Sequence, residues 1–308
     1  MKRTAALLPV FAGIMWGSAG IFVRTLTGFG MDRITIISTR MIVAVPLLLI
    51  LLLITDKRRL RIRLKDLWIF AGCGLIGILG LNLFYNESVG VLSLSLAAIL
   101  LSTAPFFALF FSRLIFHEKI TAWKIFCLVM AIAGCILAGG ILESGGGKWS
   151  SSGIAMGLAA AVFFALYGIF SRFGTNRGYS TFTILFYSML MICIVLLPAT
   201  DFSCFGKFIA EAPLANSGFA FIHSLFTSVL PYLLYTISLI YMENGRVAIL
   251  SGGAEPASAF VFGILFYSEI PTALNLLGLA LTIAALTLMC IDPHAKAEPG
   301  PLESLQKK

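Results

Sequence analysis

The chain carries the stretch PFFALFFSRLIFHE at residues 105–118 and the stretch PASAFVFGILFYSE at residues 256–269. Each stretch begins with a proline and continues as an apolar run to a glutamate thirteen residues after the proline. The two prolines are 151 residues apart. A second pair, GIFVR at 20–24 and GIFSR at 168–172, is separated by 148 residues. Two motifs that recur in the same order at nearly the same offset indicate that the chain consists of two similar halves.

The apolar character of these stretches extends over the whole chain. Of the 308 residues, 59% are hydrophobic and 12% are charged, and the mean hydropathy is +0.99. A soluble domain is about 45–50% apolar and about 25% charged, so this composition excludes a cytosolic enzyme, a secreted disulfide scaffold and a disordered protein. Long uninterrupted apolar runs also favour helices over a transmembrane barrel, whose strands alternate apolar and polar residues. We therefore predict an all-α polytopic membrane protein.

Ten apolar segments are long enough to cross a bilayer as helices, which takes about 20 residues. The first follows a basic start, MKRT, and contains small residues, as a signal peptide does. Because nine further spans follow and the first apolar stretch is long, we interpret it as an uncleaved helix. The connections are short, and the longest covers residues 200–216. The ten predicted spans are residues 6–24, 32–54, 67–86, 93–114, 122–141, 153–172, 179–199, 217–240, 247–267 and 273–291.

The positions of lysine and arginine predict the orientation of these spans, since cytoplasmic segments are enriched in both residues. With the N-terminus in the cytoplasm, 17 of the 22 Lys and Arg residues lie in inner segments and 4 in outer segments, while Arg40 lies inside the second span. This bias predicts a plasma-membrane protein with both termini in the cytoplasm. It also explains the net charge of +8 without a nucleic-acid partner. The cluster KRRLRIRLK at 57–65 either marks topology alone or also contacts anionic lipid headgroups.

The repeat and the spans together predict the domain organisation. The first repeat covers residues 1–141, a Gly- and Ser-rich linker covers 142–152, and the second repeat covers 153–291. The polar tail at 292–308 is expected to be disordered and cytoplasmic. Each repeat holds five spans, and an odd number makes the second repeat enter the membrane from the opposite side. The expected fold is therefore ten transmembrane helices in two antiparallel, inverted five-helix repeats, an arrangement typical of solute transporters.

Several motifs occur together in this chain: Trp16-Gly17-Ser18, Arg24, Arg40 in the second span and the Pro-x12-Glu units at Pro105/Glu118 and Pro256/Glu269. In these residues the chain resembles the EamA family of the drug/metabolite transporter superfamily, over nearly its whole length apart from the tail. The resemblance implies a ten-helix carrier with both termini inside. Members of this family mostly move small metabolites, amino-acid export is frequent, and others move sugars, organic acids, nucleosides or drugs. In one departure, Phe164-Ala165-Leu166 stands where the repeat would place a second Trp-Gly-Ser, so the two halves are not expected to line a cavity equally.

Two charged residues inside predicted spans are the strongest candidates for a substrate site, because an unpaired charge in the bilayer is costly. Glu255 follows two glycines and precedes Pro256, which removes a helical hydrogen bond. A locally opened helix at this depth would place Glu255 at a cavity wall. Arg40 could be the counter-ion for a substrate carboxylate. The alternatives are structural: a neutralising partner for Glu255 and, for Arg40, an ion pair with Glu87 or capping of backbone carbonyls.

Two spans that correspond to each other in the repeat carry polar and aromatic side chains at helical spacing, so each set shares one face. The two faces could oppose each other across one cavity. Alternatively, they provide interhelical hydrogen bonds and interfacial tyrosines. Trp16, in the middle of the first span, could gate the same cavity or fill space in the packing. The first set comprises Asn82, Tyr85 and Asn86, and the second comprises Ser228, Tyr232 and Tyr235.

The remaining polar residues of the spans are expected to be structural. His223 could shuttle protons, but a lone histidine in a span is more often a hydrogen-bonded part of the structure. Glu118 and Glu269 each lie just before the next helix and are expected to stabilise its N-terminus. Five of the six cysteines lie in apolar runs and no CxxC motif occurs, so we expect small packing residues and no disulfide or metal site.

These features make a secondary carrier the main hypothesis. A cavity that offers both Arg40 and Glu255 would suit a zwitterion, so the expected function is export of amino acids or related amphoteric solutes by alternating access. The expected partners are the small solute, membrane lipids and protons, which Glu255 could take up as the coupling ion. The alternatives are a multidrug- or lipid-type carrier or flippase, and an intramembrane transferase. Clustered acid–base groups, metal ligands and a GxxxxGK[ST] stretch are missing from the sequence, so neither an enzyme nor ATP nor another cofactor is expected.

Overall fold

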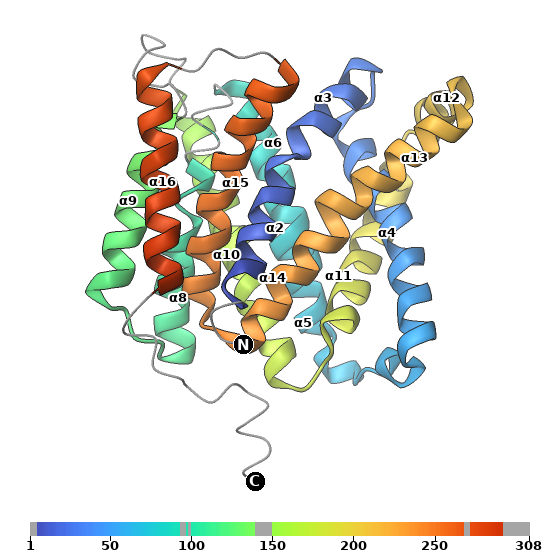
Figure 1. The fold of residues 1–308 in the computed structure, drawn as a ribbon. Helices are drawn as coiled ribbons and strands as arrows, with labels where there is room; N and C mark the ends of the chain where they lie inside the picture. Colours follow the sequence, from blue (N-terminus) through green and yellow to red (C-terminus); the bar gives the residue numbers. More distant parts are fainter. Residues whose placement is uncertain (1–4, 93–96, 98–99, 139–149, 268–271, 292–308) are drawn as a thin grey trace.

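The computed structural model describes residues 5–92, 97, 100–138, 150–267 and 272–291, and every regular element within these ranges is helical. Figure 1 shows a bundle of long helices that lie side by side. Up to Ala138 the elements are α2 (Leu7–Gly17), α3 (Ala19–Gly28), α4 (Arg33–Thr55), η1 (Lys57–Leu60), η2 (Leu64–Asp66), α5 (Leu67–Ala71), η3 (Gly72–Gly80), α6 (Leu81–Val91), α8 (Ala104–Phe116) and α9 (Ala122–Ala138). From Ser151 they are α10 (Ser151–Asn176), α11 (Thr181–Leu196), η4 (Leu197–Ala199), α12 (Phe202–Glu211), α13 (Pro213–Ser224), η5 (Leu225–Val229), α14 (Leu230–Tyr241), α15 (Asn244–Tyr267) and α16 (Ala273–Ile291).

Eight of the ten predicted spans coincide with helices that are long and apolar enough to cross a membrane. The fourth and fifth predicted spans coincide with the shorter apolar helices Ala104–Phe116 and Ala122–Ala138, which adjoin residues outside the described ranges. Ten spans in two inverted repeats therefore stay a prediction. Most of the predicted linker, all of the predicted tail at 292–308 and Glu269 also lie outside the described residues.

Helix boundaries follow the capping residues of the sequence. The Asp32 carboxylate accepts hydrogen bonds from the backbone N–H groups of Ile34 and Thr35 at the start of α4 (3.0 and 3.3 Å). Ser180 caps α11 in the same way, through Thr183 N–H at 3.2 Å. These side chains satisfy backbone donors that have no partner within the helix.

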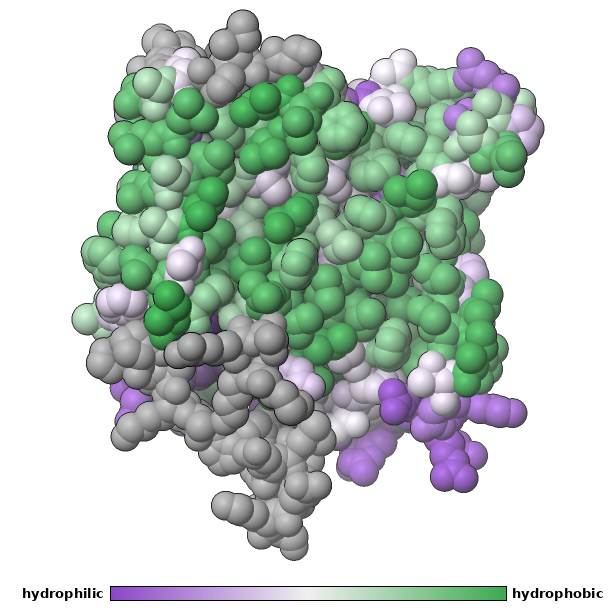
Figure 2. Space-filling view, in the orientation of Figure 1, coloured by the Kyte–Doolittle hydropathy of each residue, from purple (hydrophilic) through white to green (hydrophobic). Residues whose placement is uncertain are grey.

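The surface of the bundle has the distribution expected of a protein in lipid. Figure 2 shows a broad apolar band across the middle of this face, with hydrophilic residues gathered at its margins. The lower margin includes the arginine-rich connection between α4 and α5, and because α4 crosses the band, the α3–α4 turn lies at the opposite end. The chain is thus a multi-pass membrane protein with one end rich in arginine.

Helices of the N-terminal part pack against helices of the C-terminal part. Helix α2 packs against α14 and α15, and α10 packs against η3, α6 and α8. Two further pairs, α4 with α11 and α9 with α16, complete the interlocking arrangement. Small residues permit the closest approach: a Cβ added at Gly13 of α2 would lie 2.7 Å from Ala254 Cβ of α15, which is too close.

The longest predicted connection between spans, residues 200–216, contains the helix α12 (Phe202–Glu211). Asp201 is the N-cap of this helix, and its carboxylate accepts a hydrogen bond from Cys204 N–H at 3.0 Å. Phe208 of α12 is buried against Leu26, Met31 and Ile36, beside the α3–α4 turn. Packing against this small apolar cluster explains why the segment is helical although it is too short to cross a membrane.

Two spans contain π-helical segments where a uniform α-helix was expected. Residues Gly72–Gly80 form one such segment and Leu225–Val229 form the other, and their last residues are 149 residues apart, close to the offset of the sequence repeat. The predicted opening of the ninth span at Pro256 is wrong, since α15 continues as a helix through this proline. π-helical turns are often found at functional sites. These two lie in the third and eighth predicted spans, which carry the two sets of polar and aromatic candidate residues.

Candidate functional site

A cavity of about 760 Å³ lies within the bundle at the end that holds the α3–α4 turn. Its walls come from α2, α3, α4, α6, α10, η5, α14 and α15. Seven of the nine predicted site residues line it: Trp16, Arg40, Asn82, Tyr85, Asn86, Tyr232 and Glu255. The structure therefore brings together side chains that are far apart in the sequence.

Arg40 is buried in the wall of this cavity and is held by neutral partners. Its side chain donates to Asn82 Oδ1 at 2.8 Å through Nη2 and to Thr227 Oγ1 at 3.5 Å through Nη1. The Asn82 amide donates in turn to the Ile78 carbonyl at 2.7 Å, which directs its oxygen to Arg40. The Nε atom of Arg40 is buried and has no hydrogen-bond partner. The guanidinium is thus positioned but not neutralised by any described residue.

The predicted alternative for Arg40, an ion pair with Glu87, is wrong. Glu87 lies at the cavity mouth, where its carboxylate is 3.8 Å from Nη1 of Arg33, and both side chains are largely exposed. Arg33 also donates to the Asn86 carbonyl at 2.9 Å, which ties the start of α4 to the end of α6. The sequence analysis did not choose Arg33 or Glu87 as site residues, because charged residues at span ends are common.

Glu255 lies on the wall formed by α15, beside α2. Its carboxylate forms no hydrogen bond or ion pair with any described residue, and it does not pair with Arg40. The helices meet tightly here, since a Cβ added at Gly17 would lie 2.6 Å from the Glu255 backbone carbonyl. That carbonyl accepts from the Ser258 hydroxyl at 2.9 Å. The backbone at Glu255 is therefore fixed while its charged group faces the cavity.

Two predicted residues of the eighth span lie outside the cavity lining. Ser228 is fully buried, and its hydroxyl has no hydrogen-bond partner, whereas the adjacent Thr227 lines the cavity. Tyr235 is buried beneath Trp16, with ring centroids 5.9 Å apart, and its hydroxyl donates to Asn244 Oδ1 at 3.5 Å. Of the second set of candidate residues, Tyr232 therefore lines the cavity, whereas Ser228 and Tyr235 are buried outside its lining.

An aromatic layer closes the bottom of the cavity. Trp16 contacts Phe164 and Tyr232 edge to face, with centroid separations of 5.3 and 4.9 Å. Tyr167 packs on Tyr232 at 5.0 Å and shares a 2.7 Å hydrogen bond with Thr236. Trp16 and Phe164 are 148 residues apart, so Trp16 contacts the residue that stands where the predicted repeat would place a second tryptophan.

Beyond the aromatic layer, polar residues join the helices at the arginine-rich end. Glu118 accepts from the backbone N–H groups of Asn244 and Gly245 (3.2 and 3.5 Å), and Lys124 pairs with Glu243. The prediction that Glu118 stabilises the helix that follows it is wrong, because it lies at the N-terminus of α15. A carboxylate is favoured at any helix N-terminus, and the N-terminus that Glu118 reaches is that of α15, far along the chain.

His223 does not line the cavity. The ring is buried and stacks on Phe22 with centroids 5.1 Å apart, and its Nε2 atom has no hydrogen-bond partner. The prediction of a hydrogen-bonded structural histidine is therefore not met at this nitrogen. Among the described residues no group of three or more His, Cys, Asp and Glu side chains could hold a metal ion.

Comparison with known proteins gives consistent matches over the whole chain. The sequence model of the EamA-like transporter family matches residues 3–140 and 151–291. The uncharacterized transporter YdfC of Bacillus subtilis is 27% identical over 277 residues, which cover 87% of this chain and 85% of that protein. A protein of Streptantibioticus cattleyicolor named "Probable terminal-alkyne amino-acid exporter" is 27% identical over 300 residues, or 94% of each chain.

A solved crystal structure has a similar fold. Its TM-score is 0.72 at 15% identity, and the alignment covers 92% of this chain and 96% of the other.

Proposed function

Because the chain belongs to the EamA-like transporter family, we propose that it is a secondary transporter that exports amino acids or related amphoteric solutes across the plasma membrane by alternating access. The observation that carries this proposal is that Arg40 and Glu255 line one cavity without pairing with each other. Family members are transporters rather than enzymes, and one relative is named a probable terminal-alkyne amino-acid exporter.

Arg40 fits the role of a counter-ion for a carboxylate. A guanidinium has five N–H donors, and here two bonds go to neutral oxygens while Nε has no partner. A buried charge without a counter-ion is destabilising. A solute carboxylate would neutralise it and could accept two parallel hydrogen bonds from the planar group.

Glu255 fits the role of a partner for an ammonium group. Its carboxylate has no partner among the described residues and lines the same cavity as Arg40. In the absence of solute, a carboxylate at this depth is stabilised by taking up a proton. Since the group can hold a proton or an ammonium but not both, proton entry can displace the solute. We therefore include proton coupling in the proposed mechanism.

The packing of the helices supports two inverted halves. The contact of α2 with α15 corresponds to that of α10 with α8, and the contact of α2 with α14 corresponds to that of α10 with α6. The π-helical segments recur at the same offset. In such a pair of units, exchanging two conformations moves an opening from one side to the other. The aromatic layer around Trp16 is the barrier that must part.

The arginine bias supports an orientation with both termini in the cytoplasm. Residues 57–63 then face the cytoplasm, and the cavity at the other end faces outward. The lining combines apolar and aromatic side chains with the charged groups of Arg40 and Glu255. These two charged groups favour a solute that carries charges of its own over a lipid or a hydrophobic drug.

The test is counterflow of a radiolabelled amino-acid pool in proteoliposomes that contain the full chain. We expect Arg40→Ala and Glu255→Gln each to reduce counterflow about 10- to 100-fold, since a hydrogen bond to a charged group contributes about 1.5–3 kcal/mol. The matched controls are Lys207→Ala and Glu211→Gln, which change the same charges on the exposed α12 outside the cavity. Wild-type rates in both folded cavity variants would refute the proposal.

A further inference from the structure

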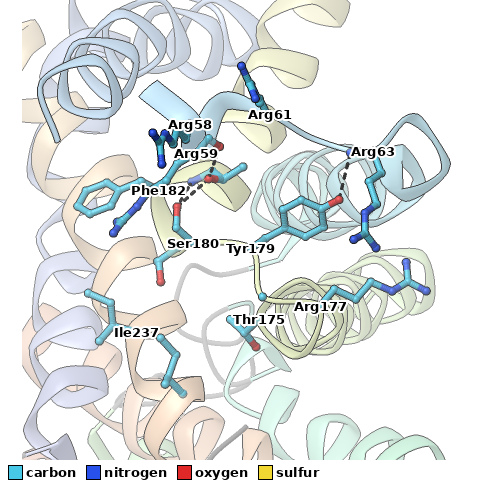
Figure 3. Close-up of a pocket in the computed structure, with 14 residues that line it drawn as sticks. Arg58, Arg59, Arg61, Arg63, Thr175, Arg177, Tyr179, Ser180, Phe182 and Ile237 are labelled. Atoms are coloured by element: carbon cyan, nitrogen blue, oxygen red, sulfur yellow. Dashed lines mark hydrogen bonds between the residues drawn. The ribbon is translucent and has the colours of Figure 1, made fainter. Parts of the chain in front are cut away.

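A second hollow of about 640 Å³ lies at the arginine-rich end, opposite the candidate substrate cavity. Five arginines line it: Arg58, Arg59, Arg61, Arg63 and Arg177. None of the acidic side chains in the described ranges lines it. Figure 3 shows that they come from two segments, with Arg58 and Arg59 on one side of Tyr179 and Arg63 and Arg177 on the other. This arginine pocket therefore joins the connection after α4 to the turn between α10 and α11.

The arginine segment is fixed in place by hydrogen bonds to α11 and its preceding turn. Thr183 donates to the Arg59 carbonyl at 2.8 Å, and Tyr187 donates to the Leu60 carbonyl at 2.7 Å. The backbone N–H of Arg63 donates to the Tyr179 hydroxyl at 3.2 Å. Marking the cytoplasmic side requires only that the charges be present. A topology signal alone does not account for arginines that are held around a hollow.

Tyr179 is the centre of this arrangement. Its hydroxyl donates to Asp66 Oδ2 at 2.6 Å while accepting from Arg63. Burial and the hydrogen bond to Asp66 raise the pKa of Tyr179, so the phenol stays protonated. It links the two sides of the pocket without adding negative charge.

The positive charge of the pocket is only partly compensated. Arg59 lies 3.7 Å from Asp56, and Arg177 pairs with Asp66 at 2.6 Å. Within the described part of the chain, Arg58, Arg61 and Arg63 have no ion-pair partner. Several guanidinium groups around one hollow are suited to the oxygens of a phosphate group.

Another wall of the pocket is apolar and adjoins the membrane. Phe182, Ile237 and Ile240 are partly exposed residues that line it, and they belong to the membrane-spanning helices α11 and α14. Nearby, Leu64 is 81% exposed and Trp68 is 44% exposed, as expected at a membrane–water interface. A phosphate bound here would have a hydrocarbon surface beside it.

We propose that the arginine pocket binds the headgroup phosphate of an anionic phospholipid, with the start of an acyl chain along Phe182, Ile237 and Ile240. The site is independent of the solute that the transporter carries. A lipid bound here would bridge the connection after α4 and the α10–α11 turn, which belong to the two predicted halves.

The test compares lipid binding to the full chain by native mass spectrometry from detergent, using phosphatidylglycerol, phosphatidylcholine and glycerol phosphate as probes. The pocket variant is Arg58→Gln/Arg63→Gln. The control is Lys57→Gln/Lys65→Gln, which removes the same charge from the same segment without changing a pocket residue. We expect phosphatidylglycerol to bind in preference to phosphatidylcholine, and the pocket variant to weaken its binding at least about tenfold while the control does not.

Three results would overturn the proposal. Equal loss in both variants would mean that diffuse charge attracts the lipid. Glycerol phosphate binding as tightly as the lipid would make the ligand a soluble phosphate ester. Equal binding of phosphatidylglycerol and phosphatidylcholine would show that the pocket does not distinguish an anionic headgroup from a zwitterionic one. A third variant, Arg58→Lys/Arg63→Lys, keeps the charge and is expected to bind at an intermediate level, because lysine lacks the planar group.

Discussion

Both ends of the bundle contain charged side chains packed between helices, but these packed charges have different partners at the two ends. At the arginine-rich end, Lys124 pairs with Glu243, and Glu118 accepts backbone N–H groups at the start of α15. In the candidate cavity, Arg40 has only neutral partners and Glu255 has none among the described residues. Paired charges hold helices together, whereas unpaired charges around an open volume are available to a ligand. Whether a charged residue in a span has a partner therefore separates a structural role from a ligand-binding role.

The largest expected effect concerns the Lys124–Glu243 pair. Lys124 is almost fully buried, so Lys124→Ala leaves Glu243 uncompensated and should lower the free energy of unfolding by about 3 kcal/mol. Thermal unfolding in detergent would measure this loss. The double variant Lys124→Met/Glu243→Leu should recover most of it, and Arg40→Ala should be milder than Lys124→Ala. If Arg40→Ala destabilised the protein as much as Lys124→Ala, the contrast between the ends would fail.

Substitution of Asn82 tests whether Arg40 must be oriented by its hydrogen bond to this neutral side chain. Asn82→Ala removes the acceptor at 2.8 Å from Arg40, so the guanidinium should lose its fixed direction. We expect KM for the transported amino acid to rise about tenfold with little change in the folded fraction, as for loss of one hydrogen bond to a charged group. Leu83→Ala, on the exposed side of α6, is the control. An unchanged KM in Asn82→Ala would mean that Arg40 does not bind the solute in this direction.

Glu118 tests whether the opposite end is held by capping. Glu118→Ala removes the acceptor of two backbone N–H groups at the start of α15, and the loss of a helix cap is typically about 1 kcal/mol. Thermal unfolding should show this smaller decrease. Glu118→Gln, which retains an acceptor, should lie between Ala and wild type. Full stability of Glu118→Ala would show that the contact does not hold α15.

The smallest effect is expected at the cavity mouth. Glu87 and Arg33 are largely exposed, and an exposed ion pair contributes about 0.2–1 kcal/mol. Glu87→Gln should therefore change counterflow by less than about threefold and leave thermal unfolding unaffected. A loss comparable to that of Glu255→Gln would place a binding residue at the mouth and extend the candidate site outward.

The sequence predicted the helices well because a membrane span needs a long apolar run, and such runs are visible without a structure. The shared cavity was also predictable in part, since polar groups such as Arg40 and Glu255 cannot face lipid and must converge in the interior. The choice of Ser228 was less successful because helical spacing assumes a uniform α-helix. The π-helical turn at Leu225–Val229 changes the spacing, and the neighbouring Thr227 lines the cavity.

Other features could not be predicted because they depend on contacts between distant segments. Glu118 caps α15 rather than the helix that follows it, and α12 is helical because Phe208 finds an apolar cluster at the α3–α4 turn. The pairing of Glu87 with Arg33 instead of Arg40 depends on where α6 ends beside the start of α4. None of these contacts has a signal in the local sequence.

Under the proposed arrangement of two repeats, the contact between Trp16 and Phe164 has a consequence for how such a protein can diverge. In an assembly of two identical chains, a residue that touches its own counterpart must appear twice, because the symmetry copies every change to both sides. One polypeptide that carries both copies is free of this constraint: an indole can face a phenyl ring. When two copies are joined in one gene, the two residues at this contact no longer have to be identical. Each side of the transport path can then change separately.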